Sequence, residues 1–302
     1  MSLELLQKEI QIWKEKRAAV ILAHNYVEGE VQDIADFVGD SLELSIKARE
    51  SRAPVIVFCG VSFMAETAKI LSPGSLVLHP VPGAGCPMAD MADRAEVAAW
   101  RSAHPDAVII AYVNTTAATK AEVDICCTSA NAEKVVQSIS PERKILFLPD
   151  QNLGANIARI TGRKIELWPG FCPPHNMILP EIVQENRQKY PDAVLLVHPE
   201  CRPAVLELAD YALSTGGMLR KVQELTAQRF LIGTEHGIIH RMRKENPDKE
   251  FIPLTPAVHC PNMKKISLES VLDALQTLSP QVELPADLID RARIPIERML
   301  AL

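Results

Sequence analysis

Three of the seven cysteines share a local setting that suits a metal centre. Cys86, Cys172 and Cys260 are each followed by proline, no other cysteine is, and the intervals between them are 86 and 88 residues. A single cysteine is usually a small buried hydrophobic residue, but three in one setting at one interval predict a common role. Cysteine thiolates are ligands for zinc and for iron–sulfur clusters.

Two inorganic partners suit three symmetric thiolates, and the residues leave both open. A tetrahedral zinc ion would need a fourth ligand, for which His175 and His259 are candidates. A [4Fe–4S] cluster would keep one iron without a protein ligand, and that iron could act as a Lewis acid on a substrate oxygen.

Polar residues end three apolar, strand-like segments. They are His24 and Tyr26 in AHNY, Tyr112 and Asn114 in YVN, and His198 and Glu200 in HPE. A carboxylate at such a position, beside a histidine and near a metal, is a candidate general base.

Small hydroxyl residues open three helical patterns: Ser41, Ser129, and the pair Ser214 and Thr215. Each alone fits an ordinary helix N-cap. Three helix N-termini aimed at one centre would instead form a site for phosphate or carboxylate groups.

An internal repeat explains how these residues meet. HPDAVIIAYVN (104–114) matches YPDAVLLVHPE (190–200) at an offset of 86 residues, and KRAAVILAHNY (16–26) is a weaker third copy. Each unit of about 87 residues reads strand, helix, strand, helix, strand, Cys-Pro, helix. The strands are short and apolar on both faces, as in parallel sheets covered by helices.

The fold class is therefore α/β, with three pseudo-threefold-related three-layer α/β/α domains around a central site. The expected boundaries are 1–104, 105–190 and 191–280, each containing one Cys-Pro step, followed by a C-terminal helical tail at 281–302. Ligands of parallel sheets bind beyond the carboxyl ends of the strands, where the polar residues and the Cys-Pro loops all lie.

Composition excludes several classes of protein. The chain has 302 residues, 47% hydrophobic content and a net charge of −6, so a general nucleic-acid binder is not expected. No apolar run approaches the ~18 residues of a membrane span, and the N-terminus reads as an amphipathic helix, so we expect a cytoplasmic protein. The remaining cysteines, Cys59, Cys126, Cys127 and Cys201, are interpreted as structural thiols.

The chain resembles the quinolinate synthase family of de novo NAD biosynthesis over essentially its whole length. The resemblance rests on AHNY, GDS, GCPMADM, YVN, TSAN, WPGFC, HPEC, STGGM and TEHGIIHR, in this order. It implies one [4Fe–4S] cluster per chain, held by Cys86, Cys172 and Cys260. It also implies the condensation of iminoaspartate (iminosuccinate) with dihydroxyacetone phosphate to quinolinate, with loss of phosphate and two waters.

The resemblance also implies which side chains meet the substrates. The contacts would be His24, Tyr26, Ser41, Tyr112, Val113, Asn114, Ser129, His198, Pro199, Glu200, Ser214 and Thr215. Among them, Glu200, Tyr26, His24, His198 and Tyr112 are the candidate acids and bases. An aspartate oxidase or dehydrogenase is the expected source of the imine.

Two alternatives remain at this point. One is a diphthamide-type three-cysteine [4Fe–4S] radical enzyme, which lacks the HNY, YVN and HPE segments. The other is a non-enzymatic structural metal protein or cluster carrier. A carrier needs an exposed, exchangeable cluster, whereas cysteines about 86 residues apart in three domains would bury it. The chain ends IPIERMLAL without further cysteines, so a redox switch based on C-terminal cysteines is not expected.

Overall fold

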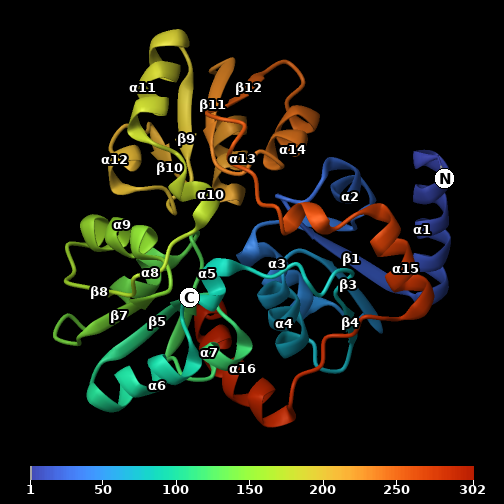
Figure 1. Cartoon of the computed structure of the whole chain (residues 1–302), viewed down its shortest axis with the longest axis horizontal. Coiled ribbons are helices and arrows are strands. Elements are labelled where there is room, and N and C mark those ends of the chain that lie inside the picture. The colour runs from blue at the N-terminus through green and yellow to red at the C-terminus, as the bar shows by residue number, and fades with distance from the viewer. Residues whose placement is uncertain (1) are drawn as a thin grey trace.

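The computed structural model describes residues 2–302 and contains three four-stranded parallel sheets, seen as three lobes in Figure 1. The strand orders are β2-β1-β3-β4, β6-β5-β7-β8 and β10-β9-β11-β12, so each sheet repeats the same topology. The predicted α/β class, with three repeated units, is confirmed. The exact boundaries between the units stay a prediction.

The strands have similar positions in each sheet. The first sheet holds β1 (Ala19–His24), β2 (Phe37–Gly39), β3 (Val55–Cys59) and β4 (Leu76–Leu78). The second holds β5 (Val108–Tyr112), β6 (Ile125–Cys127), β7 (Ile145–Leu148) and β8 (Glu166–Leu167). The third holds β9 (Val194–Val197), β10 (Tyr211–Ala212), β11 (Arg229–Gly233) and β12 (Glu250–Pro253).

Helices occupy the connections between strands. From the N-terminus to β5 they are α1 (Leu3–Arg17), α2 (Gly29–Ile34), α3 (Ser41–Glu50), α4 (Ser62–Leu71), α5 (Pro87–Asp90) and α6 (Arg94–Ala103). Next come α7 (Ala117–Lys120), α8 (Ala132–Gln137), α9 (Gln151–Thr161), α10 (Pro173–Asn176) and α11 (Pro180–Lys189). The last are α12 (Pro203–Leu206), α13 (Thr215–Glu224), α14 (Ile238–Glu245), the 3-10 turn η1 (Met263–Lys265), α15 (Leu268–Thr277) and α16 (Ala286–Leu300).

Each unit contains four strands, one more than the sequence predicted. The three predicted strands correspond to β1, β3 and β4 and their equivalents, and every residue of β3 and β5 is buried, as expected for a sheet covered on both faces. β2, β6 and β10 add a further edge strand of two or three residues. Such short segments carry little hydrophobic periodicity, although the start of VDICCTSAN had suggested β6.

The second helix after each Cys-Pro step packs on the following unit, which links the three units in a ring. α6 lies against α7 of the second unit, and α11 lies against α12 of the third. α15 returns to the first unit and packs on α1 and β3. α16 then bridges the first and second units by contacting α4, α7 and β6, as seen at the lower edge of Figure 1.

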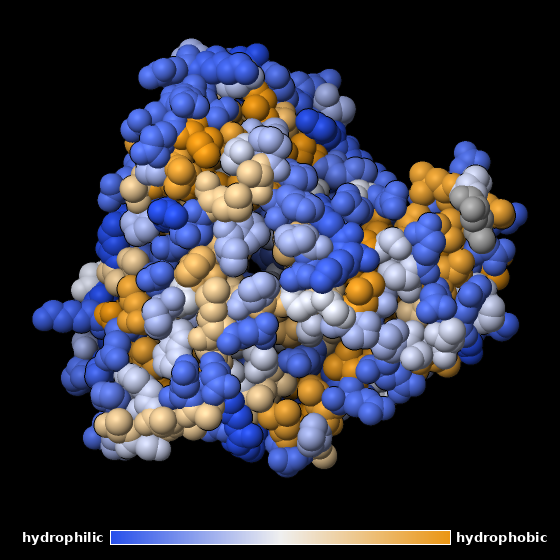
Figure 2. All heavy atoms as spheres, in the orientation of Figure 1, coloured by the Kyte–Doolittle hydropathy of each residue, from blue (hydrophilic) through white to orange (hydrophobic). Residues whose placement is uncertain are grey.

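The surface facing the viewer is mostly hydrophilic, with hydrophobic side chains in scattered groups (Figure 2). Among residues 2–302, none of the helices has both the length and the apolar character that crossing a membrane requires.

Candidate active site

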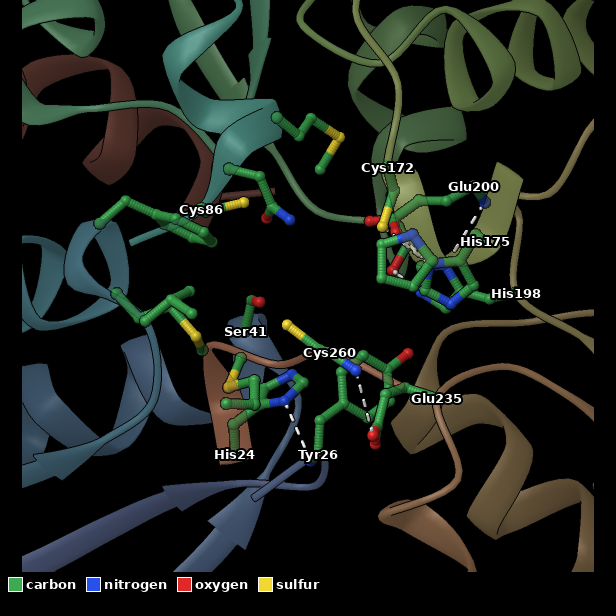
Figure 3. Close-up of a pocket in the computed structure, with 18 of the residues that line it drawn as sticks. His24, Tyr26, Ser41, Cys86, Cys172, His175, His198, Glu200, Glu235 and Cys260 are labelled. Carbon is green, nitrogen blue, oxygen red and sulfur yellow. Dashed lines mark hydrogen bonds and ion pairs between the residues drawn. The ribbon is translucent and has the colours of Figure 1, made fainter. Parts of the chain in front are cut away.

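A cavity of about 80 Å³ lies where the three units meet. All three predicted metal ligands, Cys86, Cys172 and Cys260, line it, and Figure 3 shows their sulfur atoms directed into the same space. The other predicted residues on its wall are His24, Tyr26, Ser41, Tyr112, Asn114, Ser129, His198, Glu200 and Thr215. The repeat therefore brings together residues that lie far apart in the sequence.

The Cys-Pro step has a structural reason. Cys86 and Cys172 occupy the N-cap positions of α5 and α10, with proline at the first turn of each helix. Proline suits this position because its fixed φ fits the helix and the N–H it lacks would have no partner there. The carbonyl of each cysteine accepts the N–H four residues on, and Cys260 does the same with Lys264 before η1.

Burial keeps these three thiols protonated until a metal cation replaces the protons. It raises the pKa of Cys86 to about 12, that of Cys172 well above its ordinary value, and that of Cys260 in the same direction. Three thiols facing one space are the donor set of a metal centre, and metal binding deprotonates cysteine. The other cysteines, Cys59, Cys126, Cys127 and Cys201, are fully buried and lie off the cavity wall.

His24 and His198 have the same local geometry at the ends of β1 and β9. The Tyr26 N–H donates to His24 Nδ1 at 3.2 Å, and the Glu200 N–H donates to His198 Nδ1 at 3.4 Å. Burial lowers the pKa of His24 to about 3 and that of His198 to about 4. Both rings are therefore neutral at pH 7 and carry their proton on Nε2, from which His198 meets Ser129 Oγ at 3.3 Å.

Glu200 is the charged centre of the cavity and is 3% exposed. Its Oε1 accepts from the Tyr112 hydroxyl at 2.6 Å, and its Oε2 lies 2.8 Å from His175 Nδ1. Burial opposes ionisation, but His198, His175 and the Tyr112 hydroxyl outweigh it and hold the pKa of Glu200 well below its ordinary value. Burial, followed by the charge of Glu200, raises the pKa values of Tyr26 and Tyr112 well above 10. The site thus pairs a carboxylate with two neutral phenols.

The hydroxyl residues are placed differently from one another. Ser214 is the N-cap of α13 and Thr215 its first residue, whereas Ser41 is the first residue of α3 and its N-cap is Asp40. The prediction that Ser129 opens a helix was wrong, because α8 begins at Ala132. The turn before α8 is closed by the side chain of Asn131, whose Oδ1 accepts a hydrogen bond from the N–H of Thr128 at 2.8 Å.

Three residues implied by the resemblance lie off the cavity wall. Val113 and Pro199 are buried beside it, and the Ser214 hydroxyl is taken by Asp40 Oδ2 at 3.1 Å and the Gly217 N–H at 3.1 Å. Their roles as substrate contacts stay predictions.

A buried lysine that the sequence did not single out supports Asn114. Lys120 is fully buried, and its Nζ donates to the carbonyl oxygens of Val113, at 2.7 Å, and Thr115. These carbonyls flank Asn114, whose Oδ1 is buried without a hydrogen-bond partner among the described residues. The backbone is thus fixed while the amide oxygen stays open to a ligand.

His175 and Glu235 also line the cavity, beyond the predicted catalytic and substrate-binding residues. His175 Nδ1 lies 3.1 Å from Cys172 Sγ as well as near Glu200, and Cys172, His175 and Glu200 form a group able to hold a metal. The position of His175 three residues after Cys172, on the same helical turn, was the only sequence signal. His259, the other candidate zinc ligand, is exposed beside Glu235 and His236.

Comparisons with known proteins match the chain over almost its whole length. The family model described as quinolinate synthetase A protein matches residues 8–301. Proteins named quinolinate synthase from Geobacter sp. (strain M21) and Desulforudis audaxviator (strain MP104C) are each 52% identical, over 100% and 98% of this chain and 99% and 98% of their own lengths. One from Methanoregula boonei is 51% identical over 99% of this chain and 98% of its own length.

Proposed function

The chain belongs to the quinolinate synthetase A family, an enzyme family of NAD biosynthesis, and from this premise we propose its reaction and the residues that carry it. The enzyme condenses iminoaspartate (iminosuccinate) with dihydroxyacetone phosphate to quinolinate, releasing phosphate and two waters. The observation that carries the proposal is a single cavity lined by one Cys-Pro thiol from each unit together with Glu200 and Tyr26. The radical-enzyme and structural-protein alternatives are not favoured.

Cys86, Cys172 and Cys260 would hold one [4Fe–4S] cluster per chain. The donor set fits, since three cysteine sulfurs face one space and a cube of four irons would leave one iron without a cysteine. When bound, such a cluster supplies an open iron position that polarises a substrate oxygen. A cytoplasmic location is part of this proposal, because free thiols and such clusters persist in a reducing compartment.

The chain's own residues would handle the protons. Glu200 is ionised, so it can accept a proton removed from the substrate, and Tyr112 holds its orientation through the 2.6 Å hydrogen bond. Tyr26 is a neutral phenol on the wall of the same cavity and can exchange a proton with a departing hydroxyl. His24 and His198, neutral with the proton on Nε2, would donate hydrogen bonds to substrate oxygens.

Anionic groups of the substrates would bind at helix starts. α3 and α13 each have ten residues and begin at the cavity with Ser41 and Thr215, so their positive dipole ends and these two hydroxyls favour carboxylate or phosphate. An aspartate oxidase or dehydrogenase would supply the imine.

Anaerobic purification followed by assay tests the proposal. We expect a brown protein with about four irons per chain that forms quinolinate from the two substrates. Cys86→Ala, Cys172→Ala and Cys260→Ala should each lose iron and activity, while the buried controls Cys59→Ala and Cys126→Ala should keep both. A colourless zinc protein, or three ligand variants that retain iron, would refute the cluster assignment.

A further inference from the structure

Two neighbouring hydroxyls at the start of α13 are engaged in opposite ways by the first unit. Ser214 Oγ donates to Asp40 Oδ2 at 3.1 Å and accepts the Gly217 N–H at 3.1 Å. Thr215 Oγ1 instead accepts a hydrogen bond from Asn25 Nδ2 at 3.0 Å. Both hydroxyl residues are buried, but only Thr215 lines the cavity. The hydrogen of the Ser214 hydroxyl is therefore used within the protein, whereas that of Thr215 is still available.

An arginine determines the orientation of the Asn25 amide. Arg241 Nη1 lies 3.3 Å from Asn25 Oδ1, and a guanidinium can only donate hydrogen bonds. The amide oxygen therefore faces Arg241, which turns the NH2 group toward Thr215. Arg241 is itself held by the Val38 carbonyl at 2.7 Å and by Glu245 Oε1 at 2.6 Å. Asn25 is 0% exposed and lies behind the cavity wall, so bulk solvent does not compete for these contacts.

The amide makes the Thr215 hydroxyl a directed donor. A hydroxyl has one hydrogen and two lone pairs, and the Asn25 NH2 group occupies one lone pair of Thr215 Oγ1. Among residues 2–302, no acceptor takes the hydrogen of this hydroxyl. An anionic oxygen in the cavity is the partner that suits it, because hydrogen bonds to charged acceptors are shorter and stronger than neutral ones.

We infer that Asn25 is a positioning residue that commits the Thr215 hydroxyl to donate to an anionic group of a substrate. The inference rests on the proposed function, which places carboxylate or phosphate at the start of α13. It also separates two hydroxyls that the resemblance had grouped together. Thr215 meets the anion, while Ser214 joins α13 to the first unit through Asp40.

Replacing Asn25 by aspartate reverses the hydrogen bond to Thr215. Asn25→Asp keeps the size of the side chain and the contact with Arg241, but it offers Thr215 an acceptor in place of a donor. The Thr215 hydrogen should then turn away from the cavity. Isothermal titration calorimetry of the holoenzyme with inorganic phosphate and with succinate measures the affinity for each kind of anion.

We expect Asn25→Asp to bind at least one of these probes about 10- to 100-fold more weakly than the parent. The KM of the substrate that carries this kind of anion should rise by a similar factor, with kcat changed less than about threefold. Asn156→Asp is the matched control, because Asn156 is also buried, faces Arg159 Nη2 at 2.9 Å and lies off the cavity wall. An Asn25→Asp variant that binds both probes as well as Asn156→Asp does would overturn the inference.

A double-mutant cycle separates the hydroxyl from the charge that aspartate adds. Asn25→Leu removes the amide donor and adds no charge. It should weaken binding of the affected probe by about 3- to 10-fold when Thr215 is present, but by less than about twofold in the Thr215→Val background, because Asn25 acts through the hydroxyl. Equal losses in the two backgrounds would show that Asn25 only supports the structure, and would overturn the inference.

Neutron diffraction gives a measurement that needs no variant. In crystals of the full holoenzyme grown in D2O with phosphate or succinate, deuterium should lie on Asn25 Nδ2 toward Thr215, and on Thr215 Oγ1 toward the cavity. A Thr215 deuterium directed at Asn25 would overturn the inference. A holoenzyme that shows the expected deuterium positions but forms no quinolinate would refute the proposed function and leave the role of Asn25 standing.

Discussion

Replacing Lys120 by methionine tests how the backbone on both sides of Asn114 is held in place. Lys120→Met fills similar space but removes the donor of the Val113 and Thr115 carbonyls. A buried carbonyl left without a partner costs about 1–3 kcal/mol, which for two gives at most about 6 kcal/mol. Burial lowers the pKa of Lys120, so relief of the buried charge offsets part of this loss. We expect a net destabilisation of about 2–3 kcal/mol.

Urea unfolding of the parent and variant provides the measurement. Lys134→Met is the matched control, since Lys134 is exposed on α8 and its replacement should change stability by less than about 0.5 kcal/mol. Loosening the backbone on both sides of Asn114 should also raise KM more than it lowers kcat. If Lys120→Met unfolds at the same urea concentration as Lys134→Met, the two carbonyls do not depend on the lysine.

Three further outcomes follow from the described contacts. Glu200→Gln should retain its iron but lose about 10²–10⁴-fold in kcat, because the proton acceptor is gone; near-normal turnover would remove Glu200 from the bases. His24 and His198 have folded pKa values of about 3 and about 4 and an unfolded value of about 6.5, so the unfolded chain binds more protons and stability falls as pH drops below 6.5. The pair should cost about 2 kcal/mol between pH 6.5 and 5.5 in urea unfolding, and a flat profile would contradict their buried neutral state. Asp40→Ala should lower the free energy of unfolding by about 1–2 kcal/mol, more than Asp93→Ala does. Both residues cap a helix, but only Asp40 also accepts a hydrogen bond from Ser214 of another unit. Equal effects would show that the hydrogen bond between the units contributes nothing.

The fold was predictable because the chain repeats itself. Three copies of one pattern allow each weak strand signal to be checked against two others, and buried runs such as Val55–Cys59 stand out in composition. β10, at Tyr211–Ala212, has two exposed residues and no periodicity to detect. The ring formed by α6, α11 and α15 was also missed, since spacing along a chain does not tell which neighbouring unit a helix covers.

The site was predictable where it follows a strand and hidden where it depends on packing. His24, Tyr112 and Glu200 lie at or directly after buried strands, so the carboxyl-end rule for parallel sheets located them. His175 Nε2 lies 2.8 Å from Thr234 Oγ1 although the two residues are 59 positions apart, and nothing in the sequence pairs them. Lys120 belongs to this second class, because its acceptors are backbone carbonyls that leave no mark on the sequence.

The ring of helices has a consequence for synthesis on the ribosome. The surface of the first sheet that α15 covers stays uncovered until residues 268–277 are synthesised, and Cys260 emerges only shortly before them. Chains that stop before residue 260 hold at most two of the Cys-Pro thiols and lack the helix that covers this surface. Loading of the proposed cluster would therefore be restricted to nearly finished chains, and truncated products would be incompletely folded.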